Sequence, residues 1–283
     1  MIVPESTFDA APVHPGPGFP LASLRYFVWL YAPPDQQIVV QCLLGLEREI
    51  AGTLRAVTEH QVVHVRLEWW RAESERFVNG TPVHPLTRAL AELARKLNLP
   101  EIPRGVAGFV DVATWDLAGA TFETRRELQA YCERWAGAMF DTLAAFATSP
   151  HEHVRKLGAA VREIEFLAEL ARDAHAGKLR FPLDELERGG IDPRAVARPP
   201  WPDALTALIR ARLVALQSEV ASHARELRHA DPARIRSLFV WAGLAQRLAR
   251  RVAHALPVSV SAGRADTLAE SWHAWRAARA ARP

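Results

Sequence analysis

Three acidic residues with helical spacing are the clearest chemical feature of this chain. Glu165, Glu169 and Asp173 are four residues apart, so on a helix their carboxylates lie along one face. Neighbouring like charges on a helix repel by about 0.2–0.5 kcal/mol per pair, and a cation or solvent must screen them. Carboxylate oxygens are ligands that Mg²⁺ prefers. The stripe therefore predicts either a metal site or the solvated face of an amphipathic helix.

One cation lies close to this stripe in the sequence. Arg162 is three residues before Glu165, a spacing that brings two side chains together on a helix. A guanidinium and a carboxylate form a strong, charge-assisted hydrogen bond. We therefore expect Arg162 to pair with Glu165 or Glu169.

Two other groups of ligand-type residues have spacings that do not suit a metal ion. Glu47 and Glu49 are two residues apart, and so are the histidines of the His151-Glu152-His153 triplet. On a helix, such side chains point about 200° away from each other. We expect no chelation at either place, and at most one of Glu47 and Glu49 to face a cavity.

Apolar residues recur at three- and four-residue spacing from about residue 35 onward, and strand-like alternation is scarce. This pattern predicts an all-α protein. Gly, Pro and Asn clusters separate the expected helices. These helices are expected over 36–57, 61–79, 85–97, 124–146, 151–176, 203–229, 231–256 and 264–280.

The composition sets broader bounds. A chain of 283 residues, 49% of them hydrophobic, can fold around one core. Its net charge of +3 permits contact with anionic lipids or diphosphates, while its dispersed arginines and lack of an aromatic platform argue against nucleic-acid binding. Cys42 and Cys132 are isolated, which suits a reducing compartment. With no signal peptide or membrane span, we expect a cytoplasmic protein that meets a membrane only peripherally.

The segment TLAESWHAWRAARAARP at the carboxyl end has two interpretations. Trp272 and Trp275 lie three residues apart near Arg276, Arg279 and Arg282. A helix with this composition can rest on an anionic membrane surface. Alternatively, it packs both tryptophans on the domain and leaves the arginines in solvent.

The acidic stripe lies in LGAAVREIEFLAELARDAHAGKLRFP (157–182), which resembles the second aspartate-rich helix of squalene and phytoene synthases, LGxAxQLTNILRDxxxDxxxGRxYLP. Glu169 stands at the first Asp of the family's DxxxD, and Asp173 at the second. Arg162 replaces a Gln, Glu165 an Asn, Lys178 an Arg and Arg180 a Tyr. A preceding block over 116–137 follows DLxxxxYxTxxELxxYCxxVAG, with Asp116, Tyr131 and Cys132 in place.

The resemblance implies an isoprenoid-synthase-like helical bundle with a central cavity, over residues 21–262. Residues 1–20 are expected to be irregular and 263–283 to form a basic, Trp-containing helix. By the same resemblance, Glu169 and Asp173 are metal ligands for Mg²⁺, and Glu165, Lys178 and Arg162 bind the substrate. Tyr131 lies at the catalytic position near the reacting prenyl chain.

The family's first aspartate-rich motif has no counterpart in QCLLGLEREIAGTLRAV (41–57). Two functions follow from this difference. The first is a protein that binds isoprenoid diphosphates or related lipids without catalysis, in which an Arg162 salt bridge fills the vacated metal site. The second is an active Mg²⁺-dependent prenyltransferase that condenses farnesyl or geranylgeranyl diphosphate. The sequence predicts neither the oligomeric state nor the substrate's chain length.

Overall fold

The structure is a computed structural model that describes residues 19–20, 23–54, 60–99, 102–119, 121–147, 151–229, 231–260 and 267–281. Within these ranges the regular elements are all helical. The helices are α1 (Leu24–Leu30), α2 (Gln37–Gly52), α3 (His60–Val78), α4 (Pro85–Leu97), α5 (Ile102–Gly105), α6 (Ala107–Leu117), α7 (Arg125–Ala136), α8 (Thr142–Ala144), α9 (His151–His175), α10 (Leu183–Arg188), α11 (Asp203–Glu226), α12 (Arg236–Ala255) and α13 (Thr267–Ala280). The all-α prediction is confirmed.

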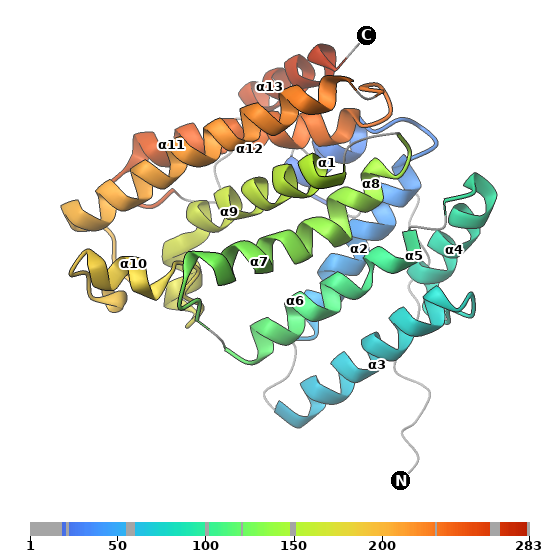
Figure 1. Cartoon of the computed structure of the whole chain (residues 1–283), viewed down its shortest axis with the longest axis horizontal. Coiled ribbons are helices and arrows are strands. Elements are labelled where there is room, and N and C mark those ends of the chain that lie inside the picture. Colours follow the sequence, from blue (N-terminus) through green and yellow to red (C-terminus); the bar gives the residue numbers. More distant parts are fainter. Residues whose placement is uncertain are drawn as a thin grey trace.

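Helix α9 occupies the middle of the bundle. It packs against α7 on one side and against α11 and α12 on the other. Figure 1 shows this arrangement, with α11, α12 and α13 above α9 and with α7, α6 and α3 below it. Ala160, Ile164, Leu167 and Ala171, opposite the acidic stripe, are all buried. The helix therefore has core contacts on both flanks and presents one charged face.

Two glycines of the 157–182 block have distinct structural reasons. A Cβ on Gly158 would lie 2.7 Å from the Cβ of Ala136 and from the ring of Phe140, so glycine permits the close packing of α9 on α7. Gly177 has a φ of +79°, which favours glycine, and it ends α9. Beyond it, the Lys178 amide donates to the Asp173 carbonyl at 2.8 Å.

Most of the expected helices are present, but the sequence pattern missed α1, α5, α6 and α10. Helix α1 is only seven residues long and lies before residue 35, where the expected helices begin. Helix α6, AGFVDVATWDL, is apolar on most sides, so it lacks the amphipathic signal. The segment expected as one helix over 124–146 is interrupted by a π-helical turn at Gly137–Asp141.

Aromatic residues fill the core beside α9. Trp135 of α7 and Trp241 of α12 are fully buried, with their ring centroids 5.6 Å apart in an edge-to-face arrangement. Phe140 packs against both rings. Among the described residues, no helix combines the length and the apolar character needed to cross a membrane.

Candidate functional site

A pocket of about 410 Å³ opens along the acidic face of α9, and we call it the α9 pocket. Residues 23–25 at the start of α1, residues 162–173 of α9, residues 244–251 of α12, Val260 and Glu270 of α13 supply its lining. The charged lining residues are Arg25, Arg162, Glu165, Glu169, Arg172, Asp173, Arg251 and Glu270. Four arginines therefore face four carboxylates.

The least exposed end of the pocket is an ionic cluster, the Glu165 cluster, formed by Arg25, Glu47, Arg162 and Glu165. Both terminal nitrogens of Arg25 donate to Glu165, at 2.7 and 3.3 Å. Arg162 donates to Oε2 of the same carboxylate at 3.0 Å, so the expected pair is present. Both arginines also lie 3.6 Å from Glu47 of α2.

Aromatic side chains enclose this cluster. The indole N–H of Trp241 donates to Glu165 at 3.0 Å, and that of Trp135 donates to Glu47 at 2.8 Å. The Arg25 guanidinium lies 4.7 Å from the Trp241 ring centroid, and that of Arg162 lies 4.7 Å from the Trp135 centroid. Planar guanidinium groups stack well on aromatic faces, which partly replaces lost solvation.

The cluster changes the acidity of Glu165. Burial by itself raises the pKa of this carboxyl group, but the charges of Arg25 and Arg162 and the hydrogen bonds from Arg25 and Trp241 outweigh burial. The pKa of Glu165 falls to about 2 as a result. Glu165 is therefore ionised at neutral pH, and its two oxygens already accept hydrogen bonds from other side chains of the protein.

Glu169 and Asp173, the predicted metal ligands, both line the more open part of the pocket. Arg172 lies between them on the same helix and forms an ion pair with Glu169. Its other contact is with Asp173, at 3.3 Å. The acidic stripe is thus screened by arginines over its whole length.

Neither glutamate of α2 joins Glu169 and Asp173 in a metal-binding group. On α2, Glu47 is engaged in the cluster, and Glu49 points away to His84 Nε2 at 3.0 Å, as their two-residue spacing predicts. The described part of the chain contains no group of three or more His, Cys, Asp or Glu side chains that could hold a metal ion. The magnesium role of Glu169 and Asp173 stays a prediction.

Tyr131 and Lys178 lie outside this pocket, around Asp116 of α6. The Tyr131 hydroxyl donates to Asp116 at 3.0 Å, and Arg180 donates to the same oxygen at 2.6 Å. Lys178 is more distant, at 3.9 Å from the second Asp116 oxygen. Burial and the charge of Asp116 raise the pKa of Tyr131. Tyr131 is thus a buried, protonated hydrogen-bond donor.

The pocket brings together four of the six predicted site residues and leaves two beside Asp116. Ring contact connects the two places, because Phe166 of the pocket lies 5.6 Å from Tyr131. The sequence analysis missed Arg25, which is 140 positions from Glu165 and belongs to no motif. Trp135 and Trp241 were missed for the same reason. Arg180 was visible only as a departure from the family pattern.

Comparison with known proteins agrees with this architecture. The squalene/phytoene synthase family model matches residues 22–269. The phytoene synthase of Rhodobacter capsulatus is 33% identical over 125 residues, which cover 42% of this chain and 35% of that protein. The phytoene synthase of Arthrospira platensis is 27% identical over 140 residues, covering 42% of this chain and 44% of that protein. Both alignments therefore span less than half of the relative's length.

Solved structures share the fold at low sequence identity. A dehydrosqualene synthase in complex with a ligand superposes with a TM-score of 0.75, at 15% identity and over 90% of each chain. Squalene synthase HpnC from Alicyclobacillus acidocaldarius gives a TM-score of 0.63 at 18% identity, over 81% of this chain and 87% of its own. Because the family model covers most of the chain and the helical bundle is shared, this protein belongs to the squalene/phytoene synthase family.

Proposed function

We infer that this protein binds an isoprenoid lipid with an uncharged polar head in the α9 pocket and does not carry out diphosphate chemistry. The balance of charges around the pocket supports this function. Each of the four lining carboxylates has an arginine partner, and Glu270, the last of them, contacts Arg247 and Arg251 at 3.1 and 3.3 Å. A diphosphate adds several negative charges that such a balanced lining does not neutralise.

The remaining surface of the pocket suits an apolar chain with a small polar head. Leu24, Phe166, Leu244, Leu248 and Val260 line it, and its volume of about 410 Å³ is in the usual range for ligand pockets, about 300–1,000 Å³. The Nε of Arg162 is buried and has no hydrogen-bond partner among the described residues. A ligand hydroxyl or carbonyl oxygen that displaces the atoms covering this donor can accept its hydrogen bond.

Calorimetric titration with prenyl alcohols and their diphosphates tests this function. We expect farnesol or geranylgeraniol to bind at least as tightly as the matching diphosphate in EDTA, with no gain when Mg²⁺ replaces EDTA. Radiolabelled farnesyl and geranylgeranyl diphosphate should give no product. Tight diphosphate binding that requires Mg²⁺ would contradict the proposal.

Two variants at the open end of the pocket give a sharper test, because they change its charge in opposite directions. Glu169→Gln makes the lining more positive and should raise diphosphate affinity about twofold to fivefold, as partly exposed charges do. Arg172→Gln should lower it by a similar factor. Neither variant should change the affinity for the alcohol, and circular dichroism would establish that both are folded.

The second candidate is Mg²⁺-dependent condensation of farnesyl or geranylgeranyl diphosphate. It is favoured by the position of Glu169 and Asp173, which both line the pocket one helical turn apart. In that case Glu169→Gln would lower diphosphate affinity in Mg²⁺ instead of raising it. A labelled hydrocarbon or cyclopropyl diphosphate product that disappears in Glu169→Ala and Asp173→Ala would establish this function in place of the first.

A further inference from the structure

Helix α13 presents its large apolar side chains outward. Leu268, Trp272 and Trp275 are 83%, 55% and 38% exposed, and their spacing of four and three residues places them on one face. The side packed on the domain carries small residues, because Ala274 and Ala278 of α13 and the following Ala281 are buried. An amphipathic helix in a soluble domain normally has its large apolar residues inside. Here the pattern is reversed.

Close packing on the inner side accounts for the alanines. A Cβ on Gly243 of α12 would lie 2.8 Å from the Cβ of Ala277, so the two helices approach closely. Ala274 and Ala278 pack in a small core with Phe27 and Val240. The two tryptophans take no part in this core. They stack on each other instead, with ring centroids 5.1 Å apart, and form an exposed apolar surface.

Positive charge surrounds this surface. Arg276 and Arg279 are exposed on the same helix, and the Arg279 guanidinium lies 5.3 Å from the Trp275 ring. Burial and the charges of Arg247, Arg250 and Arg276 lower the pKa of His273 on the same helix. Glu270 is already engaged by Arg247 and Arg251. The exposed face therefore combines tryptophan with Arg276 and Arg279, which have no carboxylate partner among the described residues.

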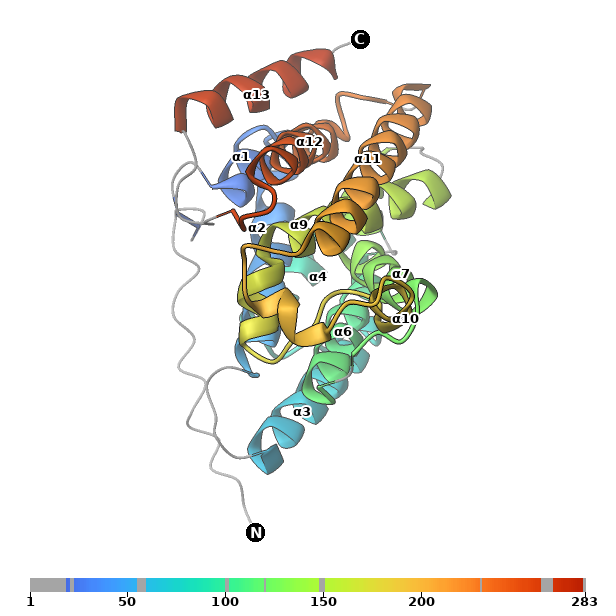
Figure 2. The same ribbon diagram turned by 90° about the vertical axis from the view of Figure 1, so that its left-hand side faces the viewer.

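On its inner side, helix α13 also adjoins the α9 pocket. Glu270 of α13 lines the pocket, together with Leu244, Leu248 and Arg251 of α12. Figure 2 shows α13 at the outer edge of the molecule, lying across α1 and α12. A surface that contacts the outer face of α13 is therefore close to the pocket.

We propose that the outer face of α13 docks this protein on an anionic membrane surface. Trp272 and Trp275 enter the headgroup region, where an amphipathic indole ring is most stable. Arg276 and Arg279 contact lipid phosphates. The charge of the face selects an anionic membrane over a purely apolar partner, and the adjoining pocket receives its lipid from the same surface.

Flotation of the full chain with vesicles tests the proposal, using phosphatidylcholine with and without phosphatidylglycerol and no added isoprenoid. The wild type should float with the anionic vesicles and much less with the neutral ones. Replacing both tryptophans with alanine should lower partitioning about tenfold or more. Arg276→Gln and Arg279→Gln should each lower anionic binding about fivefold.

Matched substitutions on α11 provide the controls. Val214→Ala removes an apolar side chain that is 62% exposed, and Arg210→Gln removes an exposed charge. Both should float like the wild type, and thermal melting by circular dichroism should show all variants folded. Equal flotation with both vesicle types, or none, would overturn the proposal. So would a dimer, seen by sedimentation, that the tryptophan variants abolish, because the face would then bind a second copy. Isoprenoid binding is measured in a separate titration, so a failure of the proposed function can be distinguished from a failure of membrane docking.

Discussion

Helix α9 carries two glutamates, the buried Glu163 and the mostly buried Glu165, that are two residues apart and point to different sides of the helix. Each is held by two arginines. Glu165 is bound by Arg25 and Arg162 beside the α9 pocket. Glu163 is bound by Arg125 and Arg212 on the other flank. The same local chemistry is thus used twice, in different surroundings.

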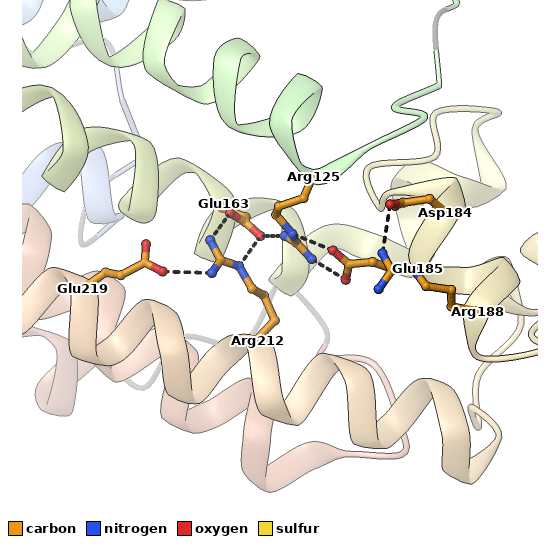
Figure 3. A network of polar contacts seen from close by, with 7 residues as sticks. All are labelled: Arg125, Glu163, Asp184, Glu185, Arg188, Arg212 and Glu219. Carbon is orange, nitrogen blue, oxygen red and sulfur yellow. Dashed lines mark hydrogen bonds and ion pairs between the residues drawn. The ribbon is translucent and has the colours of Figure 1, made fainter.

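The Glu163 network joins α7, α9, α10 and α11, and its side chains are drawn in Figure 3. Two nitrogens of Arg212 donate to the two oxygens of Glu163, each at 2.7 Å. Arg125 contacts Glu163 and also binds Glu185 of α10 through two bonds of 2.7 and 2.6 Å. Arg212 has a further partner in Glu219 at 2.8 Å. Both arginines therefore keep a close second carboxylate.

In the Glu165 cluster, the arginines have no comparably close second carboxylate. If Glu165 is removed, the nearest carboxylate to Arg25 and Arg162 is Glu47, at 3.6 Å from each, and the Trp241 indole loses its acceptor. The comparison indicates that a glutamate between two arginines is replaceable where each arginine has another partner. It also indicates that Glu165, on the pocket side, has a large structural role of its own.

The largest expected effect is the loss of Glu165. Glu165→Ala should lower the free energy of unfolding by about 3–5 kcal/mol, because it leaves two buried arginines with one distant carboxylate. Urea unfolding of the wild type and the variant measures this difference. If Glu163→Ala lowers the free energy of unfolding as much as Glu165→Ala or more, the difference proposed between the two glutamates is wrong.

Acid pH should remove most of the same stabilisation. The pKa of Glu165 is lowered from 4.5 to about 2 in the folded protein, so its contribution is complete above pH 4.5 and is lost as the pH falls toward 2. At 1.36 kcal/mol per pKa unit, this contribution is about 3 kcal/mol. Urea unfolding between pH 7 and pH 3 should show a steeper loss for the wild type than for Glu165→Gln. If the stability of the two proteins falls in parallel with pH, the titration of Glu165 is not the cause of the loss.

Removing Glu163 should cost less, about 2 kcal/mol, because Arg125 retains Glu185 and Arg212 retains Glu219. Urea midpoints of Glu163→Ala and of Glu163→Ala combined with Glu185→Ala test this reason. The second substitution should be much more damaging in the presence of the first than alone. Simple additivity would show that the second partners provide no compensation.

Tyr131→Phe should have the smallest effect, about 1 kcal/mol, because it removes one hydrogen bond while Asp116 keeps Arg180. Thermal and urea unfolding measure the change. Affinity for a prenyl alcohol should be unaltered, since Tyr131 does not line the α9 pocket. A loss of turnover in an active preparation, with stability unchanged, would instead support the predicted catalytic role.

The sequence alone predicted the fold class, the family and several contacts within single helices. Periodicity predicted the helical fold, and the 157–182 block indicated the family. Spacing along one helix predicted the Arg162–Glu165 pair and the divergence of Glu47 from Glu49. These predictions succeeded because each depends on the geometry within one element. Helix α6 was not predicted because it is apolar on most sides and has no amphipathic signal.

Sequence by itself determined which residues share the charged face of α9 and that this face carries carboxylates. Only the tertiary structure decided what those carboxylates contact. Arg25 lies 140 residues from Glu165, and Trp241 lies 76 residues from it, on helices that only packing brings together. Helical periodicity relates residues within one helix, whereas an ion pair between two helices depends on how those helices pack against each other. The charge balance of the pocket is therefore a property of the packed bundle.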